Sequence, residues 1–533
     1  MIRYVIDLTT IVAVAVVLAA AYCALKIEPL TGLHLLFPSL GEFTFRYWTI
    51  GYFPWPDTAD NIYLGFALAH GSPIIEAGAD NHMPGVPQLL GGWLWLLGYA
   101  NAIPSPRITA SAYLAACLAG LLFETTCIYV AARMMLLPPL AAALVALMAC
   151  AYTALLYDFA LPMSETLITY LLIFFPLLAS RMLLAEQPAE RLVAAVVLGG
   201  PLTFACLLLG LTIGPANALV AVTALIVAGL ELWNTPTQWR ILLHDRRCRV
   251  AYAVVAALVA VTFATVRTGD LYFWAVESNL SRDVSPIGTI AASFTVHFAS
   301  FLNGEDPIGS RYPALLSALV VYFCVKLIGA HKPASLPRLA LFGVLIVAMA
   351  ILTQWRANER FHSVTPLGLT IGVILLAAGA LPQRWNVARS SVWLLPLWLL
   401  ALGQVMFLRM AIAGPAKPEP RPAAFETANV CRAWTTINCR CAQVSVYGPQ
   451  MFLLNDMRPC PNRPLTFNAP GAMNPKIRRW IEQDATDPNV ASWVYDSDAL
   501  MIANGVPPAV VQYWRTEARC VDIDDRNKWC FAK

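Results

Sequence analysis

Two carboxylates stand three residues apart in an otherwise apolar part of the chain. Asp57 and Asp60 lie in PWPDTADNIYLGFALAHG, Pro54–Gly71, which follows the first long apolar run. A carboxylate held beside a hydroxyl can accept its proton, so this pair could react with a substrate that arrives through a membrane. The alternatives are that Asp57 is a solvated loop charge and that Asp60 caps a helix starting at Asn61.

A second group of side chains is cationic. The stretch QWRANERFH, Gln354–His362, holds Arg356, Arg360 and His362. Arginine can hold an anion through two parallel hydrogen bonds. These residues could therefore bind an anionic substrate, provided that the fold brings them close to the two aspartates.

The composition places both groups in a membrane protein. The chain has 533 residues, of which 58% are hydrophobic and 13% charged, whereas soluble domains carry about 25% charged residues. About 20 apolar residues span a bilayer as a helix. We expect about eleven such helices, with the boundary between the fifth and sixth least certain, at Thr9–Leu25, Ile108–Val130, Leu137–Tyr157, Met163–Met182, Leu192–Leu209, Gly214–Leu232, Val250–Val266, Pro313–Ile328, Pro337–Thr353, Ser363–Leu381 and Val392–Ile412.

Basic residues orient these helices. Lys and Arg in short loops mark the cytoplasmic side, and the densest cluster, 240–249, follows the sixth predicted helix. The N-terminus is then cytoplasmic, and Gln354–His362 faces outward despite its two arginines. Either this loop is a statistical exception to the charge rule, or its arginines meet an anion there. The other outward regions are Lys26–Arg107, Arg267–Tyr312 and everything after Gly414.

The first outward region, 26–107, is expected to return to the membrane surface. Apolar residues recur at helical spacing in IYLGFALAHG, which predicts an amphipathic helix lying in the interface. The run Leu89–Gly98 is too short to cross a bilayer, so we interpret it as re-entrant or surface-lying. Such a loop suits a substrate with a polar head and a lipid tail.

A different kind of sequence follows residue 413. A proline-rich linker, 414–422, precedes a tail, 423–533, in which β-like and helical runs alternate, so we expect a small α/β domain. Six cysteines in an exported tail suggest disulfides. Cys520 and Cys530 flank a predicted hairpin, and we expect them to be bonded. A metal site at Cys439 and Cys441 is the weaker alternative, because zinc sites usually use wider spacings and histidines.

The first outward loop also carries a recognisable pattern. An aspartate is followed by a helix ending in glycine, then by an acid–Asn–His/Lys–x–Pro element and an amphipathic run ending in glycine. This resembles the C-type (GT-C) membrane glycosyltransferases, in particular the protein-mannosyltransferase and aminoarabinose-transferase-like group. The match runs through Asp57, Tyr63, Gly71, Asp80, Asn81, His82, Pro84, Gly98 and Arg107, and more weakly through Glu165 and Glu359–Leu369.

The resemblance implies a mainly α-helical polytopic enzyme whose membrane part, 1–413, is catalytic. It would move one sugar, with inversion, from a polyprenyl phosphate to a hydroxyl of a lipid, glycan or protein at the outer face. Asp57 would be the general base, supported or replaced by Asp60, because Thr58 stands where the family has a second acid. The donor phosphate and substrate would be bound by His82, Arg356, Arg360, His362, Asp80, Glu165, Arg107 and Tyr63.

Several of these residues have a simpler explanation. Glu165 lies in a predicted first helical turn, where an acid is favoured by the helix dipole. Arg107 could anchor the second membrane helix at the headgroups, and Tyr63 could belong to the interfacial aromatic belt. His82 replaces the lysine that is more frequent in the family, and it could be a hydrogen-bonded loop histidine.

The other classes of function are less well supported. Charged residues are nearly absent from the centres of the predicted helices, which disfavours a transporter or flippase; a non-catalytic envelope-assembly protein is the remaining alternative. No cofactor is expected to be required, although two aspartates could bind a divalent cation. The net charge of +4 is spread over short loops, so no nucleic-acid partner is expected. We expect a bacterial inner-membrane protein with a periplasmic tail.

Overall fold

The structure is a computed structural model of the 533-residue chain. It describes residues 2–26, 65, 68–69, 85–98, 106–135, 137–156, 164–209, 214–265, 292, 295, 311–329, 336–352, 359–380, 441–443, 475–495, 497–503, 506–524 and 527–533.

The chain is mainly helical, as expected. Ten of the eleven predicted apolar runs coincide with described helices, and the eleventh, Val392–Ile412, lies outside the described residues. The helices in this part are α1 (Ile2–Lys26), α5 (Gly85–Leu96), α6 (Pro106–Met134), α7 (Pro139–Leu156), α8 (Ser164–Leu172), α9 (Phe174–Leu184), α10 (Pro188–Ala194), the π turn η2 (Ala195–Gly199), α11 (Gly200–Leu209), α12 (Gly214–Asn234), the 3-10 turn η4 (Pro236–Gln238), α13 (Trp239–His244), α14 (Arg246–Thr265), α18 (Arg311–Gly329), α19 (Leu336–Leu352) and α20 (Glu359–Ala380).

Two of the described helical stretches are each long and apolar enough to cross a membrane, namely Pro188–Leu208 and Arg246–Ala264. A third candidate joins Leu219–Asn234 to Pro236–His244 across a bend of 119°. Several shorter apolar helices, among them Pro313–Leu327 and Leu367–Ala380, lie beside them. The total of eleven spans stays a prediction.

Prolines explain two departures from regular helix. The predicted run Met163–Met182 is divided into α8 and α9 at Ile173, three residues before Pro176, which has no N–H to donate to the preceding turn. The run that begins at Leu192 continues to Leu209, but it passes through η2, which ends two residues before Pro201. The uncertain boundary of the fifth and sixth predicted helices therefore lies between α11 and α12.

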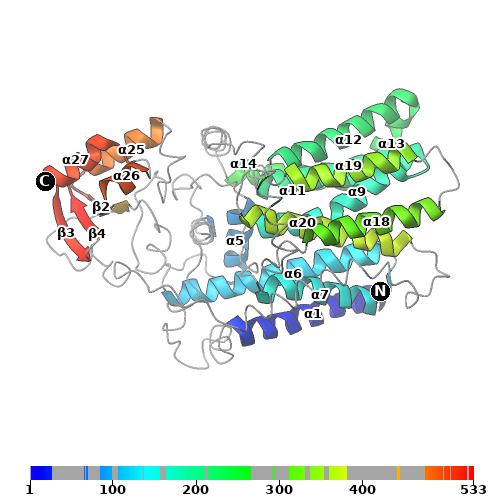
Figure 1. The fold of residues 1–533 in the computed structure, drawn as a ribbon, viewed down its shortest axis with the longest axis horizontal. Coiled ribbons are helices and arrows are strands. Elements are labelled where there is room, and N and C mark those ends of the chain that lie inside the picture. The colour runs from blue at the N-terminus through cyan, green and yellow to red at the C-terminus, as the bar shows by residue number, and fades with distance from the viewer. Residues whose placement is uncertain are drawn as a thin grey trace.

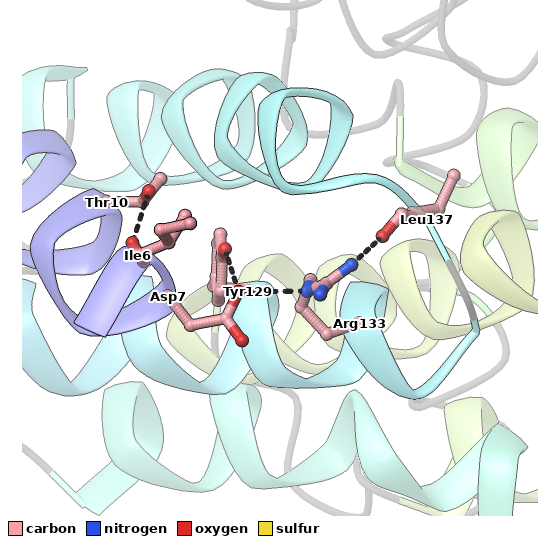
Figure 2. Close-up of polar contacts among 6 residues, drawn as sticks. All are labelled: Ile6, Asp7, Thr10, Tyr129, Arg133 and Leu137. Atoms are coloured by element: carbon pink, nitrogen blue, oxygen red, sulfur yellow. Dashed lines mark hydrogen bonds and ion pairs between the residues drawn. The ribbon is translucent and has the colours of Figure 1, made fainter. Parts of the chain in front are cut away.

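A polar cluster joins α1 to α6 near the N-terminus (Figure 2). Tyr129 Oη and Arg133 Nε both donate hydrogen bonds to Asp7 Oδ1, at 2.6 and 3.1 Å. Arg133 also donates to the carbonyl of Leu137, at the start of the connection to α7. One carboxylate thus connects the two helices, and the arginine also holds the connection between α6 and α7 through a backbone carbonyl.

A second ion pair is buried at the same end of the helices. Arg191 on α10 donates from Nε and Nη2 to the two carboxylate oxygens of Glu231 on α12, at 2.6 and 3.1 Å. Arg191 Nη1 also bonds the carbonyl of Ala185, at 2.7 Å. Both side chains are largely buried. Arg133 and Arg191 both lie in the last turn of their helices, α6 and α10.

One carboxylate lies where the sequence analysis expected almost none. Glu124 is fully buried within α6, beside Thr125, whose hydroxyl donates to the carbonyl of Leu121 at 2.7 Å. The inference that the helix centres are nearly free of charge therefore needs this correction. The surrounding apolar run concealed the acid, because Ile108–Val130 has the average hydropathy of a membrane helix despite it.

The tail forms a small α/β unit. In the described part of the tail, four strands, β1 (Cys441–Gln443), β2 (Val490–Tyr495), β3 (Arg519–Asp524) and β4 (Asn527–Phe531), pair in the order β1-β2-β4-β3. Strands β1 and β2 are parallel, and the other two pairs are antiparallel. Helices α25 (Pro475–Ala485), α26 (Asp498–Ala503) and α27 (Pro508–Thr516) cover it. Its core includes Ile481, Val494 and Trp514. The domain boundaries at 414 and 423 lie outside the described residues.

The expected disulfide is present in this unit. Cys520 and Cys530 occupy directly opposite positions of the β3–β4 hairpin and form a disulfide, with Cα atoms 4.1 Å apart. Cys431, Cys439 and Cys460 lie outside the described residues, so the remaining pairing stays open.

The helices lie roughly side by side along the long axis of the molecule (Figure 1). The N-terminus and α13 lie at one end, whereas α5 and the sheet of the tail lie toward the other. The predicted topology puts the first pair in the cytoplasm and the second pair outside, and which end faces the cytoplasm stays a prediction.

Candidate active site

Three helices that carry predicted site residues begin at the same end of the molecule. Arg107 is the second residue of α6, Glu165 the second residue of α8, and Arg360 and His362 lie in the first turn of α20. These three helices pack on one another. The first turns of these helices lie close together only if the three helices run in the same direction.

Close contacts of α20 answer this question. A Cβ at Gly368 would overlap the carbonyl oxygen of Thr169, and one at Gly372 would lie 2.5 Å from the carbonyl oxygen of Ile173. Both contacts advance by four residues along each helix, so α20 runs parallel to the α8–α9 connection. Glycines four residues apart let apolar helices approach this closely.

The far end of α20 gives the same result for α6. A Cβ at Gly379 would lie 3.2 Å from Cβ of Met135, the residue that follows the last residue of α6. The two helices thus end together, and they run parallel. The first turns of α6, α8 and α20 consequently share one end of the bundle.

The contact at Gly368 also sets relative heights along the parallel helices. Glu165 precedes Thr169 by four residues and Arg360 precedes Gly368 by eight. With a rise of about 1.5 Å per residue, the backbone of Arg360 lies about 6 Å nearer the end of the bundle than the backbone of Glu165 does. The first turn of α20 therefore lies outermost, and the first turn of α8 begins about one helical turn deeper.

Helix α5 is connected to this region through glycine contacts. A Cβ at Gly65 would lie 2.8 Å from Cβ of Leu90, and one at Gly91 would lie 3.1 Å from the carbonyl oxygen of Gly65. The first-loop segment near Gly65 is thereby fixed on α5, which contacts α6 and α11. Gly85, the first residue of α5, follows His82 by three residues in the sequence, and His82 itself lies outside the described residues.

The remaining predicted site residues are outside the described part of the chain. These are Asp57, Asp60, Tyr63, Asp80, His82 and Arg356. The structure thus brings together the helix starts that carry Arg107, Glu165, Arg360 and His362, and it leaves the position of the carboxylate pair as a prediction.

The sequence analysis missed the residues that position the site. Gly65, Gly91, Gly368 and Gly372 make the close approaches, and they were given no such role. The spacing of Gly368 and Gly372 by four residues was a visible signal for a helix contact, but which helix they would meet could not be derived from local sequence.

No protein-family model matches this sequence, and no curated protein matches it either. Solved structures do match. ArnT (aminoarabinose transferase) from Cupriavidus metallidurans bound to undecaprenyl phosphate is 13% identical, with a TM-score of 0.53 over 98% of this chain and 97% of that one. The same enzyme in the apo state is 15% identical, with a TM-score of 0.51 over 94% of this chain and 96% of that one.

A more distant match is the archaeal oligosaccharyltransferase AglB from Archaeoglobus fulgidus, in complex with an inhibitory peptide and a dolichol-phosphate. It is 11% identical over 96% of this chain and 72% of that one, and its TM-score of 0.45 adds nothing to the fold assignment. The chain has the fold of ArnT, a C-type membrane glycosyltransferase, over almost its full length. The resemblance inferred from the first loop is thereby confirmed at the level of the fold.

Proposed function

We propose that this chain transfers one sugar from a polyprenyl phosphate to an acceptor hydroxyl at the outer face of the membrane. The observation that carries the proposal is the fold shared with ArnT, whose solved structure holds undecaprenyl phosphate. The common end of α6, α8 and α20 supports it, because the helix starts that carry Arg107, Arg360 and His362 lie together there.

The proposed step breaks one bond and forms one. The acceptor oxygen bonds to the anomeric carbon while the bond from that carbon to the phosphate oxygen breaks with its electron pair. The proton of the acceptor hydroxyl passes to Asp57, with Asp60 as support or substitute. The products are the inverted glycoside and free polyprenyl phosphate, through an oxocarbenium-like transition state.

The cationic residues at the helix starts would stabilise the negative charge of the leaving phosphate. The leaving phosphate gains negative charge as the bond breaks, and cations held in a low-dielectric site stabilise it. Arg356, Arg360, His362 and His82 would supply them. The N-termini of α6, α8 and α20 add partial positive charge at the same end. We propose that the reaction needs no metal, so that chelation with EDTA leaves its rate unchanged.

The test is sugar transfer by the purified full-length protein in lipid nanodiscs, supplied with labelled undecaprenyl-phosphate sugars and envelope extract. Release of free polyprenyl phosphate is the readout, because it does not require the acceptor to be known; lipid, glycan and protein fractions of the extract then identify the acceptor class. The wild type is expected to release it with at least one donor.

Two variants probe the proposed roles. Asp57→Asn is expected to lower the rate by about 10²–10⁴, as expected for loss of a general base. Arg360→Gln is expected to lower it by about 10²–10³, as expected for loss of one charge-stabilising donor. Arg338→Gln is the matched control, because Arg338 is exposed in the first turn of α19 at the opposite end of the bundle.

Unchanged transfer in the double variant Asp57→Asn/Asp60→Asn would exclude the carboxylate mechanism. Failure of the wild type to release polyprenyl phosphate from every donor would exclude the function itself.

Transport of an amphiphilic substrate is the second candidate, and Glu124 is the observation that favours it. Ionisable groups buried within membrane helices often lie on transport pathways. A fluorescent lipid-flipping assay in proteoliposomes distinguishes the two. Movement that is lost in Glu124→Gln, together with absent sugar transfer, would favour transport over the enzyme.

A further inference from the structure

A cavity lies between helices that carry none of the predicted site residues. The η2–α11 stretch, α12 and α14 enclose about 540 Å³, within the range of about 300–1,000 Å³ that small-molecule sites occupy. Small residues leave this space open, among them Gly200, Ala228 and Ala251. A Cβ added at Gly200 would meet no atom within 4 Å.

The cavity has a tight floor and an open rim. At the floor, a Cβ at Gly199 would lie 2.9 Å from Cβ of Ala224, so α12 closely approaches the π turn there. At the rim, the side chains of Leu225 and Tyr252 are 71% and 43% exposed. The lining is almost entirely apolar. An apolar chain could therefore enter sideways from the bilayer.

The depth of the cavity matches one leaflet. Along α14 its lining extends from Ala251 to Ala256, five and ten residues beyond Arg246 at the helix start. At about 1.5 Å per residue, these positions lie about 8 and 15 Å from the helix start. Half of a hydrocarbon core of about 30 Å is about 15 Å. A chain anchored beside Arg246 would thus fill the cavity and end near the bilayer midplane.

The end of the helices nearest the cavity, at the start of α14, is strongly basic, although its arginines do not line the cavity. Arg240, Arg246 and Arg249 are exposed, and among the described residues no carboxylate lies within ion-pair distance of them. Arg247, by contrast, pairs with Asp245, with 3.0 Å between Nη2 and Oδ2. The side-chain hydrogen bond from Arg247 holds the pKa of Asp245 below its ordinary value. Three positive charges are therefore available to a headgroup.

Aromatic residues mark the headgroup level at the same place. Trp233, at the end of α12, is 84% exposed, and Trp239, at the start of α13, is 51% exposed. The guanidinium carbon of Arg240 lies 6.0 Å from the centroid of the Trp239 ring. Tryptophan is enriched where membrane helices meet the headgroups, so the arginines lie at the height of lipid phosphates.

We propose that this cavity binds one acyl chain of an anionic phospholipid from the leaflet on the N-terminal side, with the lipid phosphate at Arg240, Arg246 and Arg249. The charge of these three arginines selects an anionic lipid over a zwitterionic one. The proposed donor places its phosphate at the opposite end of the bundle, so the cavity is a separate lipid site. This inference does not depend on sugar transfer.

The test is native mass spectrometry of the detergent-purified full-length protein, titrated with dioleoyl-phosphatidylglycerol or dioleoyl-phosphatidylethanolamine. The wild type is expected to bind one molecule of the anionic lipid at least about tenfold more tightly than the zwitterionic one. Gly200→Leu and Ala256→Leu, which fill the cavity, are expected to lose this bound lipid. Gly229→Leu is the matched control, because a Cβ at the exposed Gly229 also meets no atom within 4 Å and the residue does not line the cavity.

The charge requirement is tested separately. Arg246→Gln/Arg249→Gln is expected to weaken binding of the anionic lipid by roughly tenfold to thirtyfold and to leave binding of the zwitterionic lipid unchanged. Arg338→Gln, at the same end of the bundle, is expected to change neither.

Three results would overturn the proposal. The first is equal affinity for the two lipids. The second is retention of the bound lipid in both cavity-filling variants. The third is preferential binding of undecaprenyl phosphate that Gly200→Leu abolishes, which would assign the cavity to the tail of the donor.

Discussion

At the scale of single residues, the buried pair Arg191–Glu231 illustrates how this chain connects its helices at the end opposite the predicted active site. The guanidinium satisfies both carboxylate oxygens and two backbone carbonyls. Removing one partner would leave the other charge buried without compensation, which costs far more than the intact pair contributes. The pair is therefore expected to be sensitive to single substitutions and tolerant of a matched double one.

Glu231→Gln is expected to destabilise the protein by about 3–5 kcal/mol, because Arg191 loses its counter-charge in a buried site. Thermal unfolding in detergent measures this. Glu190→Gln, at an exposed acid one residue before Arg191, is the control and should leave the unfolding temperature unchanged. A double variant Arg191→Met/Glu231→Leu that is less stable than Glu231→Gln would contradict the explanation.

At the scale of elements, the contact between α20 and the α8–α9 connection aligns the proposed site. The carbonyl of Thr169 lies where a side chain at Gly368 would have to be. Any larger residue there would push the helices apart at the level just below Glu165 and Arg360. Stability and sugar transfer should consequently fall together.

Gly368→Ala is expected to cost about 1–3 kcal/mol, as overpacking of a tight contact does, and to lower the transfer rate. Gly229→Ala is the matched control. Its added methyl meets open space, and alanine has the higher helix propensity by up to about 1 kcal/mol, so stability should stay level or rise. Full activity in Gly368→Ala would mean that the α8–α20 contact does not position the site.

The features that could be predicted from the sequence are those that depend on interactions between residues close together in the chain. The Cys520–Cys530 bond could be predicted because the residues are ten positions apart across one hairpin. The helices could be predicted from runs of apolar residues, and so could the parity that puts Arg107, Glu165 and Arg360 at one end. The contact of Gly368 with Thr169 joins segments about 200 residues apart, and no local pattern encodes which partner a small residue meets. Glu124 was missed because its neighbours outweigh it in any average of hydropathy.

At the scale of the whole molecule, the two ends of the bundle are expected to lie on opposite sides of the membrane. The Cys520–Cys530 disulfide agrees with a tail in an oxidising compartment. The exposed arginines near α13 agree with a cytoplasmic face at the N-terminal end.

Alkaline phosphatase fused after Lys533 is therefore expected to be active in a bacterial host, because that enzyme matures only outside the cytoplasm, whereas a fusion within 240–249 should be inactive. Phosphatase activity at the internal fusion alone would reverse the proposed orientation.

Replacement of Cys530 by serine should destabilise the tail by about 2–3 kcal/mol, the value for closing a loop of this size.

The length of α6 has a consequence for how a lipid carrier would be handled. Its 29 residues correspond to about 43 Å, which is close to the thickness of about 40–45 Å that a bilayer reaches when its headgroups are included. If Arg133, which pairs with Asp7, lies at one surface of the membrane, the start of α6 at Arg107 would reach the level of the phosphates in the opposite monolayer. The bond between the sugar and the carrier phosphate would then break while the carrier stays in the lipid layer. Its long tail could remain among the surrounding lipid tails throughout the reaction cycle.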